Sequence, residues 1–334
     1  MDDPPNESAP AQRAAAPRVA GGPVWLRRVR PYGFVLVPLV ALWELFAHVS
    51  IVRGVPRDHD WIAARDYIAR VRREGDLVAS APWWTDPLAR MHFARMISLR
   101  DAARPDATSY ARAWVATIRG GRHPDFAGWP EVSSQRFGAV TVRGLRNPAP
   151  ARVRFDFVDA LRPPRAEVFR HEPGGDRACD FRDRLRVEGG GLGQGALAGP
   201  ERYQCGEPWN YVGRTIAEDM DHRGRLCIWS HPVVAVPMRT IFHDVPLANA
   251  IRGHHVVAYE AERGGDHGET GAPITLTVYV GDDIIGRDVH ADGEGWKLFQ
   301  FDTRRWANTT QRVTFEVTVE VGGNRHYCFQ ADAR

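Results

Sequence analysis

The sequence lacks the short motifs that mark the common catalytic and metal sites. It has no Cys-x-x-Cys pair, no His-Glu-x-x-His run and no Gly-x-Ser-x-Gly elbow. The usual signatures of zinc sites, zinc proteases and serine hydrolases are therefore missing. Lysine is nearly absent too, since 44 basic residues include only one lysine, Lys297. The 41 acidic residues almost cancel the arginines, and a net charge of +3 gives no electrostatic footprint for nucleic acid.

Long apolar runs are also absent, with one exception near the N-terminus, residues 33–52 (GFVLVPLVALWELFAHVSIV). A helix of this length can cross the ~30 Å hydrocarbon core of a bilayer. The run is longer than the ~7–15 residues typical of a signal-peptide core, and no Ala-x-Ala site directly follows it. Arginines precede it, which favours a cytoplasmic N-terminus and an extracytoplasmic, periplasmic location for the bulk of the chain. These arginines are Arg13, Arg18, Arg27, Arg28 and Arg30.

The apolar run contains one formal charge, Glu44, and His48 four residues later shares its helix face. An ionisable group in lipid needs a partner, so Glu44 is the best pointer to a membrane protein partner. The simpler interpretation places His48 near the outer interface and leaves only Glu44 unusual. Residues 1–32, rich in Ala, Pro and Arg, are expected to form a disordered cytoplasmic tail.

Cysteine is scarce, and all four residues lie in the second half of the chain. An even number of cysteines in an extracytoplasmic region suggests disulfides, although four cysteines allow three connectivities. We favour Cys179–Cys205, which would close a glycine-rich excursion, and Cys227–Cys328, which would tie the last strand to an earlier one. Four buried free thiols are the alternative.

After the apolar run, residues 57–147 are expected to form a small α/β domain. Residues 58–73 have the apolar period of a helix, and Asp76–Ala81 (DLVASA) that of a short strand. Further strands are predicted at Trp114–Ile118 and Phe137–Leu145. This order of strand, helix and strand is typical of an α/β unit.

The turn after the first strand carries Trp83, Trp84 and Asp86. Ligands bind at the carboxyl ends of strands in open α/β sheets, so a stacking aromatic pair with a carboxylate is one interpretation. The other is an aromatic cap on a small core, with Asp86 or Thr85 capping a helix that runs to about Ser98.

The runs IARVRREGDLVASAPWWTDPLAR, YARAWVATIRG and RFGAVTVRGLRNP resemble the soluble extracytoplasmic domain of dolichyl-phosphate-mannose-type glycosyltransferases, which act on lipid-linked sugars. The resemblance covers residues 60–147. It implies an envelope or glycan setting, but it transfers no catalytic residue, because that family holds its catalytic acids in membrane-helix loops and this chain has a single span.

From residue 151 to 334 the apolar period changes to two, which predicts half-buried antiparallel strands. About ten short strands separated by turn residues indicate a β-sandwich or barrel. The fold class expected for the chain is therefore α+β: one transmembrane helix, a small α/β segment and an antiparallel β-sandwich. The predicted strands are 153–157, 211–216, 226–230, 239–242, 254–262, 274–280, 296–302, 313–321 and 326–332.

The succession of VPL (Val245–Leu247), Gly253-His254-His255, Gly295-Trp296, VTFEVTVEV and a terminal Cys-Phe strand resembles a galactose-binding-domain-like jelly roll. This is the fold of many carbohydrate-binding modules, and the resemblance covers residues 202–334. It implies a carbohydrate-binding role without naming a ligand, because such folds host many functions.

Other candidate groups in this region are less specific. Trp209 follows a Glu-Pro pair in a loop and is the better stacking candidate, whereas Trp296 is expected in the core. The run Gly189–Gly195 is expected to be a flexible loop, because no lysine follows it. The histidines, which lack metal spacing, are expected at solvent-facing strand positions. They are His231, His243, His254 and His255.

Acidic residues cluster around one predicted hairpin near the C-terminus. A structural calcium ion is possible there, with ordinary acidic turn residues as the alternative. No other cofactor is expected. These residues are Asp282, Asp283, Asp288, Asp292 and Glu294.

Taken with the single span, these patterns predict a membrane-anchored extracytoplasmic protein of the bacterial cell envelope. We expect it to bind glycan or a partner protein through the jelly roll, without turnover. The alternative is an envelope-sugar-processing enzyme related to glycosyltransferases or hydrolases, which would need paired carboxylates across a cleft.

Overall fold

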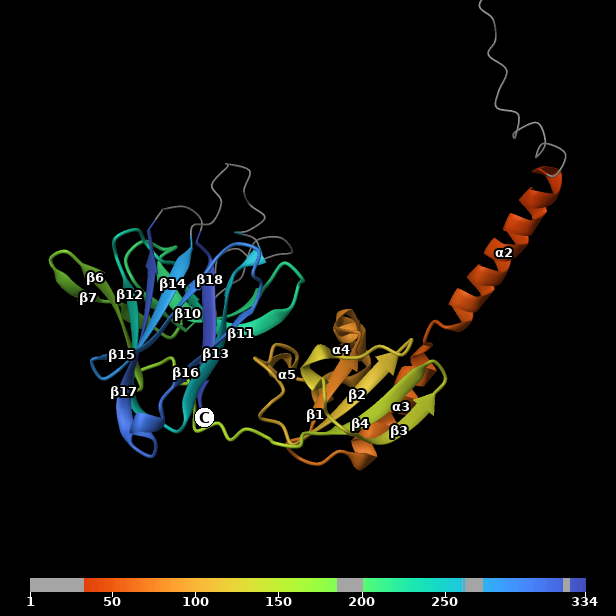
Figure 1. Cartoon of the computed structure of the whole chain (residues 1–334), viewed down its shortest axis with the longest axis horizontal. Coiled ribbons are helices and arrows are strands. Elements are labelled where there is room, and N and C mark those ends of the chain that lie inside the picture. The colour runs from red at the N-terminus through yellow and green to blue at the C-terminus, as the bar shows by residue number, and fades with distance from the viewer. Residues whose placement is uncertain (1–32, 185–200, 260, 262–272, 321–324) are drawn as a thin grey trace, which may run out of the picture. The chain divides into compact units, whose positions relative to one another are not determined.

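The computed structural model describes residues 33–184, 201–259, 261, 273–320 and 325–334 (Figure 1). The chain forms two compact units, Met1–Val55 and Pro56–Arg334, and each is described by itself. The predicted tail, residues 1–32, and the glycine-rich run Gly189–Gly195 lie outside the described residues.

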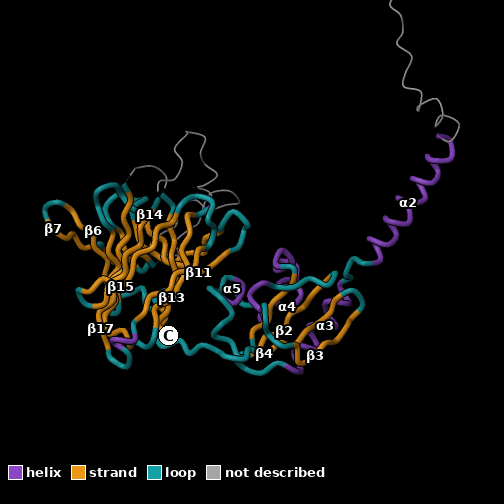
Figure 2. Tube along the Cα trace, in the orientation of Figure 1, coloured by secondary structure: helices purple, strands orange, loops and turns teal. Residues whose placement is uncertain are grey.

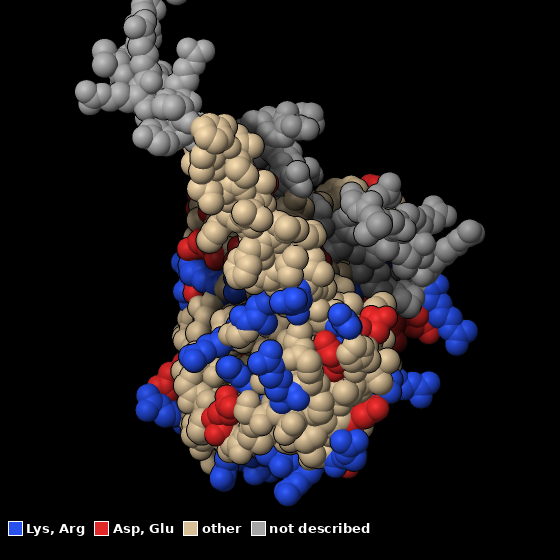
Figure 3. Space-filling model, turned by 90° about the vertical axis from the view of Figure 1, so that its right-hand side faces the viewer, with Lys and Arg blue, Asp and Glu red and all other residues tan. Residues whose placement is uncertain are grey.

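The first unit contains the predicted apolar helix, α2, over Gly33–Arg53. At 1.5 Å per residue its 21 residues span about 30 Å, enough for the hydrocarbon core. Its large side chains are exposed, with Phe34 at 77% and Trp43 at 71%, and the side of α2 seen in Figure 3 is almost uniformly uncharged. Within the described part of the chain, this is the one segment whose helix is long and apolar enough to cross a membrane. Such a helix serves as an anchor or as a signal sequence.

The second unit begins with a small α/β region whose sheet has the order β1-β2-β4-β3 (Figure 2). Strands β1 and β2 run parallel, and the other two pairs are antiparallel. The elements are α3 Asp58–Val71, β1 Leu77–Ala81, η2 Trp83–Thr85, α4 Asp86–Phe93, η3 Ala94–Met96, α5 Leu99–Ala102, β2 Arg112–Ile118, η4 Pro124–Phe126, β3 Glu131–Phe137 and β4 Val140–Arg146.

Two expectations for this region were wrong in detail. The predicted strand Phe137–Leu145 is the second half of a hairpin, because the chain turns at Gly138, whose φ is +55°. The helix expected to reach Ser98 ends at Phe93, because Ala94 takes a φ of +48° that an α-helix does not allow. Local backbone geometry, which has no periodic signal in the sequence, decided both.

Helices α3 and α4 pack against the sheet. The apolar stripe of α3 supplies Trp61 and Ile68 to a core that also contains Val78, Phe93 and Val140. These residues recur with the period of an α-helix, so they lie on the one face of α3 that can reach the sheet. Ala79 and Val115 belong to a separate cluster with Phe126.

The rest of the second unit is an antiparallel β-sandwich, as expected. An eight-stranded sheet has the order β16-β13-β18-β11-β10-β9-β8, with β5 also paired to β18, and a six-stranded sheet has the order β15-β14-β17-β12-β6-β7. An aromatic cluster that includes Phe157, Phe242, Phe315 and Phe329 belongs to the core. The strands are β5 Phe155–Asp156, β6 Ala166–Glu172, β7 Gly175–Ala178, β8 Asp180–Arg182, β9 Arg202–Gln204, β10 Tyr211–Glu218, β11 Gly224–Ser230, β12 Met238–Pro246, β13 Ala250–Val257, β14 Ile274–Val280, β15 Asp283–His290, β16 Lys297–Asp302, β17 Thr310–Val319 and β18 Tyr327–Ala333.

The sequence analysis missed strands that lie at or near the sheet edges. Strands β7 and β15 are largely exposed, so their residues carry no clear alternation of apolar and polar side chains. The strand expected at 153–157 shrinks to β5, because only Phe155 and Asp156 pair with β18. Edge pairing depends on the neighbouring strand rather than on burial, and for that reason it leaves a weak sequence signal.

Two histidines were wrongly expected at solvent-facing positions. His254 is 7% exposed and His255 is fully buried, because β13 lies between β16 and β18 and is covered on both faces. Nδ1 of His255 lies 2.7 Å from the Tyr327 hydroxyl, and Nδ1 of His254 lies 2.7 Å from Nε2 of Gln330. Burial lowers the pKa of His255 to about 3 and that of His254 to about 2, so both imidazoles are neutral.

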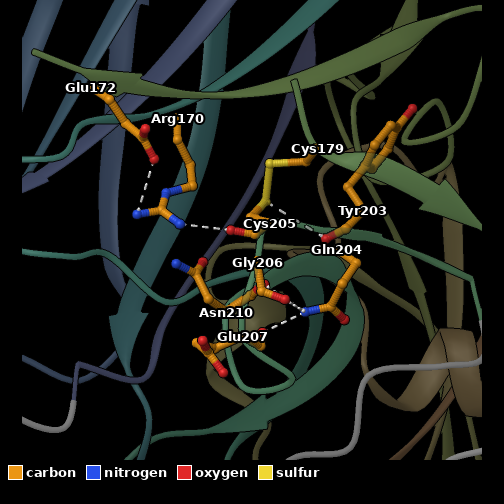
Figure 4. The surroundings of a disulfide bond; sticks show 9 residues. All are labelled: Arg170, Glu172, Cys179, Tyr203, Gln204, Cys205, Gly206, Glu207 and Asn210. Atoms are coloured by element: carbon orange, nitrogen blue, oxygen red, sulfur yellow. Dashed lines mark hydrogen bonds and ion pairs between the residues drawn. A yellow bond between two sulfur atoms is a disulfide. The ribbon is translucent and has the colours of Figure 1, made fainter. Parts of the chain in front are cut away.

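Both favoured disulfides are present in the sandwich, Cys179–Cys205 and Cys227–Cys328. Figure 4 shows the first of them, where Nη1 of Arg170 donates to the Cys205 carbonyl at 2.8 Å. The same guanidinium pairs with Glu172 at 3.3 Å. Both residues belong to β6, so the side chain that bonds to the disulfide segment is itself oriented by an ion pair along its own strand. Together with the apolar helix, the disulfides indicate an extracytoplasmic location.

Candidate functional site

The site begins at one edge of the four-stranded sheet. Because β1 and β2 are parallel, their carboxyl ends lie at the same edge, and the loops that follow them meet there. The loop after β1 contains Trp83 and Trp84, and the loop after β2 contains His123. The two loops approach closely at Gly121, where an added Cβ would lie 2.6 Å from Cδ of Pro82. Glycine is therefore required for the edge to close in this way.

A hollow of about 430 Å³ lies beside these loops, and we call it the Trp83 pocket. Its other wall comes from the sandwich, through the hairpin of β10 and β11. The α/β region and the sandwich are bonded to each other here, since the Leu226 N–H donates to the Ala103 carbonyl at 2.7 Å. The residues that line the pocket and that the argument below uses are Trp83, Trp84, Asp86, Arg90, Arg104, His123, Asp125, Glu218, His222, Arg223 and Arg225.

The carboxylate of Asp86 accepts a hydrogen bond from Oγ of Ser80 at 2.7 Å. Ser80 is buried in β1, so the strand fixes the position of this carboxylate. Burial raises the pKa of Asp86, although Arg104 and Arg90 oppose this rise. Thr85 occupies the N-cap position of α4, as one of the two expected alternatives, but neither side chain makes a capping bond: Asp86 bonds to Ser80, and Oγ1 of Thr85 donates to the Pro82 carbonyl.

Asp125 is held in an ion pair with Arg104, whose Nη2 donates to the carboxylate at 2.9 Å. Nη1 of Arg104 donates to the Asp101 carbonyl at 2.8 Å, and Nη2 lies 3.1 Å from Nε2 of His123. Burial and the nearby guanidinium lower the pKa of His123 to about 4. At neutral pH this imidazole is therefore an uncharged donor or acceptor at the pocket wall.

The sandwich wall is ordered by Asp219, a buried carboxylate at the turn of the β10–β11 hairpin. It accepts from Nη2 of Arg223 at 2.9 Å and from the Arg223 N–H at 2.9 Å. Glu218 pairs with His222 at 3.2 Å on the exposed rim. Arg225 follows in β11, with its Cζ 5.3 Å from the ring centre of Trp296. This wall therefore presents two guanidinium groups together with Glu218 and His222.

The structure brings together three of the four predicted ligand-binding residues. Trp83 is 37% exposed, Trp84 is 55% exposed, and both line the Trp83 pocket with Asp86. Trp209 is 50% exposed, as expected for a loop residue, but it does not line this pocket and lies 4.9 Å from His231 between ring centres. Trp296 is buried at 7%, as expected. A ligand-binding role for any of them stays a prediction.

Other predicted sites receive less support. The acidic residues near the β14–β15 hairpin are engaged by cations: Asp282 pairs with Arg312, Asp283 with Arg305, and Asp288 with Lys297. Across the described residues, no group of three His, Cys, Asp or Glu side chains could hold a metal ion, so the calcium expectation is not supported. Glu44 is exposed on α2, and its role as a contact to a membrane partner stays a prediction.

The sequence analysis missed the residues that the second loop and the hairpin contribute. His123 and Asp125 follow the predicted strand Trp114–Ile118, so the rule that placed Trp83 at a strand end could have found them. Arg104 and Arg225 had no such signal, because Arg104 meets His123 and Asp125 only through the fold of the α/β region, and Arg225 reaches the pocket only through packing of the sandwich on that region.

A second hollow, of about 520 Å³, lies under the loop from Gly121 to Glu131. Its lining includes Trp129 and Phe126, with Arg143 3.6 Å from Glu131. It is larger than the Trp83 pocket, but it contains none of the predicted ligand-binding residues. The exposed aromatic pair beside the Asp86 carboxylate makes the Trp83 pocket the stronger candidate.

Comparisons with known proteins add structural neighbours but no family. No family model matches the sequence, and no curated protein matches it. The tandem CBM51 modules of Sp3GH98, a family 98 glycoside hydrolase from Streptococcus pneumoniae SP3-BS71, match with 10% identity and a TM-score of 0.30, covering 60% of this chain and 57% of that one.

Two further structures match over shorter stretches. The K2 cleaved adhesin domain of Lys-gingipain matches with 14% identity and a TM-score of 0.22, over 33% of this chain and 72% of that one. The CBM22-1–GH10 modules of Clostridium thermocellum xylanase 10B match with 12% identity and a TM-score of 0.23, over 37% and 24%. At these TM-scores no argument rests on the matches, and the sandwich is established by its strand pairing. The comparisons do not support the resemblance to glycosyltransferases.

Proposed function

We propose that this protein is a membrane-anchored, extracytoplasmic glycan-binding protein of the bacterial cell envelope that performs no turnover. The observation that carries the proposal is the Trp83 pocket, where two exposed indoles lie beside a carboxylate that no cation neutralises directly. Indole faces stack on the apolar face of a sugar ring, and fixed polar groups at the rim bond its hydroxyls. The Asp86 carboxylate, fixed by Ser80, is an acceptor of this kind.

The state of the pocket carboxylates argues for binding rather than hydrolysis. Glycoside hydrolysis uses two carboxyl groups on either side of the bond that is cleaved. Of the three carboxylates in this pocket, Asp125 is paired with Arg104 and Glu218 with His222. Among the described residues, Asp86 alone of the three contacts neither an arginine nor a histidine, so no second unengaged carboxylate accompanies it.

The binding proposal can be tested with two variants that remove the same side chain. Trp84→Ala and Trp209→Ala each delete an exposed indole, of 55% and 50% exposure, from different places. Retention of the full-length protein, in detergent, on immobilised envelope glycan should fall about tenfold for Trp84→Ala, since loss of one stacked ring costs about 1–2 kcal/mol. Trp209→Ala should retain its binding.

If Trp209→Ala loses retention and Trp84→Ala keeps it, the glycan site lies at Trp209 in the sandwich and not in the Trp83 pocket. A glycan array that stays blank for the folded wild-type protein would refute glycan binding and favour a protein partner.

A second candidate function rests on one observation, the raised pKa of Asp86. A rise in pKa favours the protonated form of a carboxyl group, and this form can act as a general acid toward a glycosidic oxygen. Incubation of the protein with envelope glycan, followed by mass spectrometry for shortened products, tests this function. Products that form with the wild type and not with Asp86→Asn would establish an enzyme, and unchanged glycan would leave the binding proposal standing.

The proposed topology has residues 33–52 in the inner membrane and the chain from Val55 onward in the periplasm. It is supported by the arginines before α2 and by the two disulfides. Protease added to intact spheroplasts should digest the second unit. In untreated cells, the protein should be found in the membrane fraction with its N-terminal residues still present. Release of a shortened, soluble form would instead identify α2 as a signal sequence.

A further inference from the structure

Arg225 stands out among the pocket residues because it is largely buried without a counterion. Its Nη1 is buried and makes no hydrogen bond, and no carboxylate among the described residues lies within ion-pair distance of it. Burial lowers the pKa of Arg225 to about 10, against the distant influence of Asp125 and two other carboxylates. The indole of Trp296 compensates only part of this cost, since a cation–π contact is weaker than a desolvated ion pair.

Arg104 on the opposite wall repeats the pattern in part. Its guanidinium is 6% exposed and pairs with Asp125, but its Nε is buried and makes no hydrogen bond. A buried donor without an acceptor costs roughly 1–3 kcal/mol. Two arginines from different parts of the fold therefore line one pocket: Arg104 is paired with Asp125, and Arg225 has no carboxylate partner among the described residues.

The ion pairs of the lining also leave guanidinium groups without a carboxylate partner among the described residues. Four arginines line the pocket against three carboxylates, and His123 is neutral at pH 7. Arg223 is taken up by Asp219 and Asp221, and Arg104 by Asp125, so Arg225 and the exposed Arg90 remain without a carboxylate partner among the described residues. The lining therefore contains two guanidinium groups without a carboxylate partner among the described residues, Arg225 and Arg90, beside the Asp86 carboxylate.

We propose that the Trp83 pocket binds an acidic sugar, whose anionic group is held by Arg225 while its ring stacks on the paired indoles. This inference rests on the proposed glycan-binding function and specifies its ligand class. A guanidinium matches the planar, two-oxygen geometry of a uronate carboxylate and also binds phosphate. Asp86, which Ser80 holds at the pocket wall, would accept from ring hydroxyls.

Trigalacturonic acid and its methyl ester form a pair of probes with the same sugar rings, in which methyl groups remove the charge of the carboxyl groups. The full-length protein in nanodiscs of neutral lipid is titrated with each probe by calorimetry. We expect the acid to bind about tenfold more tightly than the ester, as hydrogen bonds to a charged group are worth about 1.5–3 kcal/mol. Glucose 6-phosphate and glucose form a second pair. Tighter binding of the charged probe in either pair supports the proposal, and the pair that shows it tells whether the anionic group is a carboxylate or a phosphate.

Arg225→Gln should reduce the preference for the acid over the ester to less than about twofold. Arg312→Gln is the matched control, because it removes an exposed arginine on β17, outside the pocket, and should keep the preference. Equal binding of charged and neutral probes by the wild type, or a preference that survives in Arg225→Gln, would overturn the inference and leave glycan binding intact. No binding of any of the four probes would overturn both, and the wild-type comparison decides even where Arg225→Gln does not fold.

Discussion

The α/β region and the β-sandwich of the second unit differ in where they place several aromatic, histidine and cysteine residues: the first exposes an indole pair in a loop, and the second buries two histidines within a strand. The α/β region has no cysteine, and it presents Trp83 and Trp84 in a loop just past a strand end, partly exposed. The sandwich contains both disulfides and buries His254 and His255 inside a central strand. The comparison teaches that groups at strand ends are available to a ligand, whereas groups within paired strands serve the stability of the fold.

The largest expected effect is on the sandwich, through its longer disulfide. Replacing Cys227 and Cys328 by alanine reopens a loop of 101 residues, which costs about 4.7 kcal/mol in the chain-entropy model. The equivalent change at Cys179 and Cys205, with a separation of 26, should cost about 3.5 kcal/mol. Urea unfolding of the two double variants measures the difference.

The same variants sharpen the regional comparison. Amide hydrogen exchange should show loss of protection in β11 and β18 and retained protection in β1 and β2, because no disulfide lies in the α/β region. Equal loss of protection in both regions would show that they unfold as one cooperative unit and would contradict the contrast drawn here.

The next effect is an acid sensitivity to which two buried histidines of the sandwich contribute, in addition to His123 of the α/β region. His254 and His255 are neutral in the folded chain, with pKa values near 2 and 3, but in the unfolded chain they titrate near 6.5. Between these values the unfolded chain binds more protons, so the free energy of unfolding is fully retained above pH 6.5 and falls as the pH decreases. At pH 5 each histidine should account for a loss of about 2 kcal/mol.

Urea unfolding at pH 7 and pH 5 measures this slope. His255→Gln should reduce the slope even if it lowers the stability at both pH values, since glutamine does not titrate. His59→Gln is a suitable control because this histidine is exposed on α3. A slope that is the same in wild type and His255→Gln would show that the buried histidine is not its source.

A smaller effect is expected where the two loops of the α/β region meet. Gly121→Ala places a Cβ 2.6 Å from Cδ of Pro82, so the loops must separate at a cost of about 1–3 kcal/mol. Ligand retention should fall with it, because His123 and Trp83 move apart. Gly174→Ala in the β6–β7 turn meets no atom within 4 Å and should change neither stability nor retention. If Gly121→Ala retains the ligand as well as the wild type does, the contact between the two loops is not needed for ligand binding.

The smallest effect on stability is expected for Trp84→Ala, within about 0.5 kcal/mol, because its ring is more than half exposed. Trp61→Ala, which empties a buried position of α3 in the same region, should cost about 3–5 kcal/mol. Thermal unfolding of the two variants distinguishes a ligand-facing indole from a core indole. A large loss of stability in Trp84→Ala would return this residue to the role of an aromatic cap.

Much of the fold was predictable because burial imposes a period on the residues. The apolar stripe of α3, the buried strand β1 and the alternating strand β17 were all anticipated from their patterns. Exposed edge strands such as β7 and β15 carry no such period. The turn at Gly138 and the stop at Ala94 depend on single backbone angles, and the expected elements there were therefore wrong.

The candidate site was predictable only in its first loop. Trp83, Trp84 and Asp86 are consecutive or nearly so, and a strand end precedes them, so one segment was enough to propose them. The role of Asp86 was open, because its bond to Ser80 follows from the geometry of the turn and not from a capping motif. Trp209 has the same sequence character, yet the fold places it outside the pocket.

The sequence by itself determined the apolar helix and the strands with a regular apolar period, because these follow from composition or local period, whereas the pairing of the four cysteines was one of three connectivities until the fold chose it. The tertiary structure decided which distant groups meet, above all Arg104 and Arg225, which come from a short helix–loop segment and from a strand of the sandwich. It also decided that His254 and His255 are neutral, since burial on both faces of β13 removes water from both imidazoles. The physical reason is that charge and desolvation depend on neighbours in space, and a one-dimensional pattern does not contain them.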